Sequence, residues 1–159
     1  MRLVIAVSAL LAVLVPPSAA GAVIVPQESI KGVKLDMTVG DVRALLGGPD
    51  RFRTVRSEFA GRVREWRYGL TTITFDGTAA DAKVTTVSTR SRAERTAAGV
   101  GVRSTKRTVR SRVPNVRCLV EFNYDHCFVG RWRAGEVVTD FSIDSRGRVS
   151  RVTLGRVLD

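Results

Sequence analysis

Hydrophobic residues follow a helical period in two short stretches of the chain. In the first stretch, Val42, Leu45 and Leu46 fall at positions i, i+3 and i+4, which places them on one face of a helix. Thr38 is suited to cap this helix, and Asp41, three residues later, completes a capping box. The Gly-Gly-Pro run after Leu46 is a typical helix end. The pattern therefore predicts a helix of about two to three turns that starts after Thr38.

A second helix is predicted from residues 104–105 to Val113. It places Val109 and Val113 four residues apart and stops before a Pro-Asn pair. Both predicted helices are too short to be stable alone in water, so each is expected to pack on another element.

After each predicted helix, apolar and polar residues alternate with the period of β-strands, and turn residues separate the runs. Strands are predicted at residues 51–59, 62–68, 70–75 and 83–89, and again at residues 117–124, 127–133, 137–143 and 148–154. This order of elements predicts an α+β fold with antiparallel sheet.

The chain also resembles itself when it is shifted by 67 residues. Residues 32–46 and 99–113 share Gly, Val, Thr, Val and Arg in register, which is five identities over 15 positions, and each stretch contains a predicted helix. We therefore expect two tandem repeats of a helix-plus-antiparallel-sheet unit, at residues 23–90 and 91–159.

Residues 32–50 carry a Gly, a Met-Thr helix start, a Val-Arg pair and a Leu-Leu-Gly-x-Pro helix end. This stretch resembles the opening motif of the superfamily that holds β-lactamase inhibitory protein and the small outer-membrane assembly lipoproteins of the SmpA/OmlA type. The resemblance implies helices laid against an antiparallel sheet, in tandem as in the inhibitory protein, and a role in binding proteins or in envelope assembly. The lipoproteins need an N-terminal Cys that this chain lacks, and no inhibitory residue can be matched to a position here.

The first 22 residues have the layout of a secretory signal peptide. Met1-Arg2 is positively charged, residues 3–15 are apolar, and residues 20–22 supply the small side chains that cleavage needs. The apolar run is shorter than the roughly 20 residues of a membrane-spanning helix. We expect a secreted or cell-envelope protein with no transmembrane span after cleavage; a buried strand or an uncleaved anchor is the alternative.

Cys118 and Cys127 are the two cysteines of the chain. In an exported protein such a pair is expected to form a disulfide. Closing this short loop would stabilise the fold by about 2.5–3 kcal/mol.

The formal net charge of +11 attracts the chain to polyanions such as wall polymers, anionic lipid or acidic proteins. Export argues against nucleic acid as the partner. Because nearly all of the positive residues are Arg, the charge either serves binding or reflects a GC-rich genome.

Few residues suggest catalysis. His126 is the single histidine. A zinc site needs three or four ligands at suitable spacing, and Cys127 is better explained by a bridge to Cys118. His126 is therefore interpreted as an exposed turn residue beside that cysteine. Glu65 is expected to pair with an arginine on a neighbouring strand. Turn positions are predicted for Asp50, Asp76 and Asp144. We therefore predict no enzyme, no catalytic or metal-binding residues and no cofactor.

Two groups of residues are candidates for binding. Along a strand, Arg64, Trp66 and Tyr68 share one face, and Trp, Tyr and Arg often dominate binding hot spots. The alternative is that Trp66 and Tyr68 belong to the core beneath the first helix. A similar group in the second half consists of Arg131, Trp132 and Arg133. A separate basic patch at helical spacing, which either meets a polyanion or is simply solvated, consists of Arg103, Lys106, Arg107 and Arg110.

Together these patterns predict a monomeric, secreted, non-catalytic binding protein that acts as an inhibitor or partner of an exported protein. The alternative is a cationic cell-envelope protein that binds anionic wall or surface polymers.

Overall fold

The computed structural model describes residues 23–58 and 61–158, so the predicted signal peptide lies outside the described residues. Ten strands and two helices are described. The helices are α1 (Val39–Leu46) and α2 (Lys106–Arg112), and a small hairpin is formed by β1 (Ile24–Val25) and β2 (Ser29–Ile30). The remaining strands are β3 (Arg51–Ser57), β4 (Gly61–Tyr68), β5 (Thr71–Phe75), β6 (Val84–Thr89), β7 (Arg117–Glu121), β8 (Tyr124–Gly130), β9 (Val137–Ile143) and β10 (Val149–Arg156).

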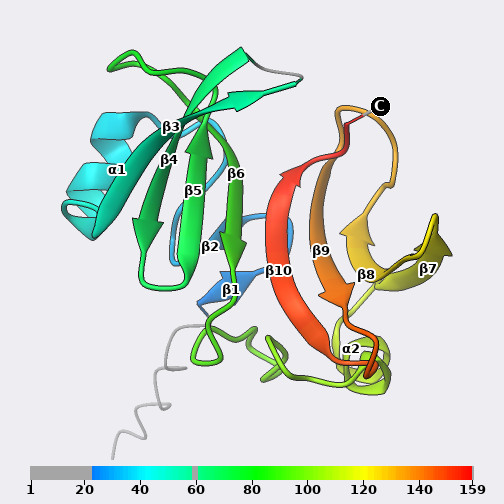
Figure 1. Cartoon of the computed structure of the whole chain (residues 1–159). Helices are drawn as coiled ribbons and strands as arrows, with labels where there is room; N and C mark the ends of the chain where they lie inside the picture. Colours follow the sequence, from blue (N-terminus) through cyan, green and yellow to red (C-terminus); the bar gives the residue numbers. More distant parts are fainter. Residues whose placement is uncertain (1–22, 59–60, 159) are drawn as a thin grey trace, which may run out of the picture.

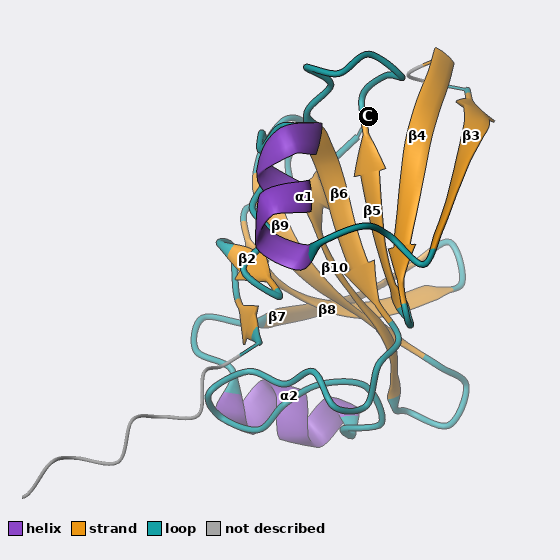
Figure 2. Cartoon of the chain, turned by 90° about the vertical axis from the view of Figure 1, so that its left-hand side faces the viewer, coloured by secondary structure: helices purple, strands orange, loops and turns teal. Residues whose placement is uncertain are grey.

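Strands β3 to β10 form one antiparallel sheet in the order β3-β4-β5-β6-β10-β9-β8-β7 (Figure 1). The sheet is strongly twisted, so β3 and β4 stand upright in Figure 2 while β7 and β8 run almost across the view. Neither helix in the described part of the chain is long and apolar enough to cross a membrane.

The expectation of an α+β fold made of two tandem helix-plus-sheet units is wrong. The described chain is mostly antiparallel sheet with two helices of eight and seven residues, and the strands after both helices join one continuous sheet. The junction is the pairing of β6 with β10, which sets Val87 opposite Leu154. An unpaired strand edge would leave backbone N–H and C=O groups without partners, so pairing the two edges satisfies them.

The local predictions are confirmed more closely. The Thr38 hydroxyl accepts a hydrogen bond from the backbone N–H of Asp41, and the Asp41 carboxylate accepts one from the backbone N–H of Thr38. Thr105 caps α2 by accepting from the backbone N–H of Thr108. All eight predicted strands are present, with ends displaced by a few residues.

The sheet has a covered face and an open face. One row of side chains across four strands is buried and consists of Trp66, Ile73, Val87 and Leu154. Val42 of α1 and Val109 of α2 pack into the same core. Both helices and the β1–β2 hairpin lie on this side of the sheet, as Figure 2 shows. The opposite side is the open face, and it faces the viewer in Figure 1.

Candidate functional site

The first predicted binding group lies on the covered face. Trp66 is 3% exposed, and the guanidinium of Arg43 on α1 lies 5.4 Å from the centroid of its ring. Tyr68 packs beside it and donates a hydrogen bond to the carbonyl of Gly47 at the end of α1. The core interpretation of Trp66 and Tyr68 is therefore confirmed. Arg64, on the same face, donates to a backbone carbonyl in the loop after β5.

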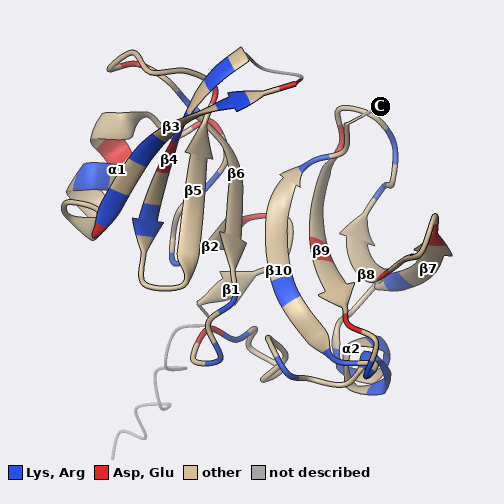
Figure 3. Ribbon diagram, in the orientation of Figure 1, with Lys and Arg blue, Asp and Glu red and all other residues tan. Residues whose placement is uncertain are grey.

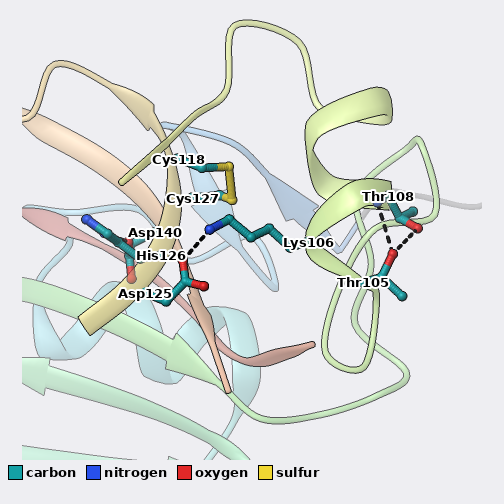
Figure 4. The surroundings of a disulfide bond; sticks show 8 residues. All are labelled: Thr105, Lys106, Thr108, Cys118, Asp125, His126, Cys127 and Asp140. Carbon is teal, nitrogen blue, oxygen red and sulfur yellow. Dashed lines mark hydrogen bonds and ion pairs between the residues drawn. A yellow bond between two sulfur atoms is a disulfide. The ribbon is translucent and has the colours of Figure 1, made fainter. Parts of the chain in front are cut away.

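Two of the four residues of the predicted basic patch are exposed arginines on α2. Arg103 lies before the helix begins, and the Nζ of Lys106 is 2.6 Å from the carboxylate of Asp125 (Figure 4). Arg107 and Arg110 remain exposed, but α2 lies on the covered side of the sheet. These arginines therefore do not belong to the open face.

Cys118 and Cys127 form the predicted disulfide. The two cysteines occupy directly paired positions of β7 and β8 on the covered face, so the bond ties the edge strand β7 to the sheet (Figure 4).

The predicted acidic roles are also confirmed. Glu65 on β4 accepts from the Nε of Arg53 on β3 at 2.7 Å. The turn carboxylates accept backbone hydrogen bonds, and those from Arg148 and Arg146 help to hold the pKa of Asp144 below its usual value. The other turn residues, Asp50 and Asp76, accept from the backbone of Gly69 and Lys83.

The open face is crossed by one row of side chains that the strand register aligns over all eight strands. The row runs Arg51, Arg67, Thr72, Ser88, Thr153, Asp140, Phe128 and Arg117. Three arginines, three hydroxyls and one carboxylate make this row polar and net positive. Figure 3 shows basic positions on β3, β4 and β10 and an acidic position on β9.

Two adjoining clefts hollow the open face. The aromatic cleft has a volume of about 530 Å³, and its lining includes Tyr124, Trp132, Asp140, Ser142 and Arg151. The arginine cleft has a volume of about 490 Å³, and its lining includes Arg53, Arg67, Thr72, Ser88 and Arg90. Thr86, Arg151 and Thr153 line both clefts, so the two together form a groove across the centre of the sheet.

Arg151 reaches this junction because of a β-bulge. Val149 pairs with Ile143, but Arg151 pairs with Ser142, so β10 holds one residue more than β9 at this point. The extra residue, Ser150, shifts the alternation of the strand, and both Ser150 and Arg151 line the aromatic cleft. The guanidinium of Arg151 makes no ion pair or hydrogen bond with another described residue. The bulge thus places an unpaired cation at the centre of the open face.

His126 is buried in the middle of β8, so its interpretation as an exposed turn residue is wrong. The turn is instead made by Phe122 and Asn123, which have positive φ angles, and β8 begins at Tyr124. The Nδ1 of His126 lies 2.6 Å from Oδ1 of Asp140, and its Nε2 has no hydrogen-bond partner among the described residues. Figure 4 shows His126 and Asp140 together on the side of the sheet away from the disulfide.

The carboxylate of Asp140 is held by three neighbours. Oδ1 contacts His126, and Oδ2 accepts hydrogen bonds from the hydroxyls of Tyr124 and Ser142. Burial raises the pKa of Tyr124 to about 12, and its hydrogen bond to Asp140 acts in the same direction. The ring of Trp132 lies 4.5 Å from the imidazole, centroid to centroid, and covers it. The charge of Asp140 is therefore engaged without Arg151.

In the second predicted binding group, Trp132 is the residue that lines the groove. Arg131 and Arg133 are exposed in the turn after β8, and Arg131 lies 3.9 Å from Glu136. Sequence reasoning missed Arg151, Tyr124 and Asp140. The spacing of buried residues in β10 held a signal, because two residues lie between Val149 and Val152 where regular alternation leaves one.

No protein-family model and no curated protein matches the chain. Among solved structures, the chain is similar to YjgB, a DUF4309 family protein from Bacillus subtilis, with 19% identity and a TM-score of 0.40 over 75% of this chain and 78% of that chain. It is also similar to an extracellular protein containing a SCP domain from Bacillus anthracis, with 12% identity and a TM-score of 0.49 over 77% of this chain. The chain spans 44% of the length of that second protein. The resemblance of residues 32–50 to the superfamily of the inhibitory protein stays a prediction.

Proposed function

We propose that the chain is an exported, non-enzymatic binding protein that holds an anionic polymer of the cell envelope in the groove on its open face. The observation that carries this proposal is the unpaired guanidinium of Arg151 where the two clefts meet. Arg67 and Arg90 line the groove beside it, while Glu65 is already paired with Arg53. The groove therefore has more positive than negative charge to offer a ligand.

The lining of the arginine cleft favours a polymer over a protein surface. Stable protein interfaces have an apolar core inside a polar rim. Here the arginine cleft is lined largely by arginine and threonine or serine, and Trp66, the expected hot spot, is buried on the other face. A chain-like anion can contact several arginines in succession along such a groove.

The disulfide and the N-terminal sequence support an extracellular or envelope location. Disulfides persist in oxidising compartments outside the cytosol, and Cys118 and Cys127 are joined. Residues 1–22 have the composition of a secretory signal. The absence of catalysis in this proposal fits the position of His126, which is 0% exposed beneath Trp132 and cannot reach a bound ligand directly.

The proposal is tested by binding to immobilised polygalacturonate and polyphosphate as salt rises from about 0.05 to 0.5 M, a range over which surface charge contacts are screened. The double variant Arg67→Gln/Arg151→Gln should weaken binding by about tenfold or more, since a charge-assisted hydrogen bond contributes about 1.5–3 kcal/mol. The matched control is Arg107→Gln/Arg110→Gln, which removes the same charge from α2. Equal losses in both variants would show that overall charge, and not the groove, holds the polymer.

A protein partner is the second candidate, and the tip of the β7–β8 hairpin is the observation that favours it. Phe122 is fully exposed at a φ of 45°, and Val120 beside it is 66% exposed. A bulky residue at positive φ is strained, so its presence at a turn suggests a use beyond folding. An inhibition screen against secreted hydrolases would test this candidate, with Phe122→Asn as the variant and Phe52→Asn, on the opposite edge strand, as the control. Loss of inhibition in both variants, or in neither, would count against the hairpin.

A further inference from the structure

The aromatic cleft differs from the arginine cleft because aromatic rings stand beside its polar groups. Tyr124 and Trp132 form an aromatic wall, and Val138 and Leu158 add apolar surface. Tyr124 is 42% exposed, so part of its ring is open to the cleft. The volume of about 530 Å³ lies within the range of small-molecule sites.

Hydroxyl groups supply much of the remaining lining. A hydroxyl can both donate and accept a hydrogen bond, which matches the hydroxyls of a sugar. In this cleft Tyr124, Ser142 and Ser150 already donate to acceptors in the protein, whereas Thr86 and Thr153 make no side-chain hydrogen bond with another described residue. The C–H bonds of a sugar ring carry slight positive charge, which suits the negative face of an aromatic ring. The hydroxyl residues of the cleft are Thr86, Tyr124, Ser142, Ser150 and Thr153.

Arg151 adds a specific requirement for negative charge. Arg151 and Tyr124 line the same cleft, and the positive charge of Arg151 acts to lower the pKa of Tyr124 against the effect of burial. Asp140 is the one acid among the described residues that line this cleft, and His126 and Tyr124 hold both of its oxygens. The planar guanidinium is therefore available to a carboxylate or phosphate, which it can bind through two parallel hydrogen bonds.

We infer that the aromatic cleft binds an acidic saccharide unit, with its anionic group on Arg151 and its ring against Tyr124 and Trp132. This inference rests on the proposed function, since it names the repeating unit of the polymer that the groove holds. The His126–Asp140–Tyr124 contacts position the site, because they direct the Asp140 carboxylate to His126 and Tyr124, and it forms no ion pair with Arg151.

The inference is tested by comparing four polymers at equal charge and fixed salt. Polygalacturonate carries carboxylates on sugars, phosphorylated dextran carries phosphates on sugars, poly-L-glutamate carries carboxylates without sugars, and dextran is a neutral sugar chain. We expect at least one acidic sugar polymer to bind about tenfold more tightly than poly-L-glutamate, and dextran not to bind. The tighter of the two acidic sugars identifies the anionic group.

Tryptophan fluorescence reports on the cleft without any substitution. The chain has two tryptophans, and Trp66 is buried, so acrylamide should quench Trp132 preferentially. A bound acidic saccharide should protect Trp132 from quenching. Arg151→Gln should abolish both the protection and the preference for sugar, Arg151→Lys should retain part of them, and Arg146→Gln, in an exposed turn, should change neither.

The outcomes separate this inference from the proposed function. Equal binding of poly-L-glutamate and the acidic sugars, with Trp132 unprotected, would overturn the saccharide site and leave polyanion binding in the groove intact. Failure of every anionic polymer to bind at about 0.05 M salt, where charge contacts are least screened, would overturn both.

Discussion

The two clefts of the open face treat their acidic residues in opposite ways. In the arginine cleft, Glu65 pairs directly with Arg53, so each neutralises the other. In the aromatic cleft, Asp140 is held by His126 and Tyr124, and Arg151 keeps its charge for a ligand. Whether a cation is available to a ligand therefore depends on what engages the acid beside it.

The largest expected effect comes from removing the buried acid. Asp140→Ala should lower the free energy of unfolding by about 3 kcal/mol or more, because it leaves the buried imidazole of His126 and the hydroxyl of Tyr124 without their shared partner, and each unsatisfied buried group costs about 1–3 kcal/mol. Glu65→Ala should cost less than about 1 kcal/mol, since Arg53 is well exposed. Urea denaturation of both variants measures the difference. Similar losses would mean that the two acids have similar structural roles.

The disulfide is expected to matter to one end of the sheet. Replacing Cys118 and Cys127 by Ser should lower the free energy of unfolding by about 2.5 kcal/mol. Hydrogen exchange should rise in β7, which is tied to β8 by this bond, while β3 at the other edge should be unchanged. Uniform acceleration across both edges would contradict a local role.

Ligand binding should depend more on Arg151, which has no acidic partner among the described residues, than on Arg53, which is paired with Glu65. Arg151→Gln should weaken polygalacturonate binding by about tenfold, whereas Arg53→Gln should change it by about twofold or less, because Arg53 is already engaged by Glu65. Isothermal titration calorimetry at low salt measures both constants. A larger loss from Arg53→Gln would reverse the assignment of the two clefts.

The smallest effect is expected from the ionisation of Tyr124. Its pKa is raised from 10.0 to about 12 in the folded chain, so the native state keeps a proton that the unfolded chain releases. Stability should therefore fall as pH rises from about 10 to 12. Tyr124→Phe should remove this part of the decline, as measured by urea unfolding at several pH values. An unchanged slope in the variant would place the titration elsewhere.

Features that depend on neighbouring residues could be predicted from the sequence. The Thr38 and Thr105 caps, the Cys118–Cys127 bond and the Glu65–Arg53 pair each follow from spacing or local alternation. The same alternation places Trp66 and Tyr68 on one face but does not say which face is covered, because that depends on where α1 packs.

The remaining features depend on long-range pairing. The pairing of β6 with β10 sets Thr89 opposite Val152, and no local pattern in the sequence specifies this contact. A single bulge at Ser150 moves Arg151 to the open face, and regular alternation from Val149 would have placed it on the covered one. The sequence therefore names the residues that line the groove but does not show that they lie together.

The union of β6 with β10 also has a mechanical consequence. Strands β6 and β10 pair at four positions, whereas β3 and β4 pair at seven. In Figure 1, β6 and β10 diverge above the part where they pair. The sheet should flex most easily where β6 pairs with β10. The width of the groove would then adjust while the strands on either side, β3–β6 and β7–β10, stay rigid. A ligand that contacts both Thr86 on β6 and Arg151 on β10 would hold these two strands together and slow their separation.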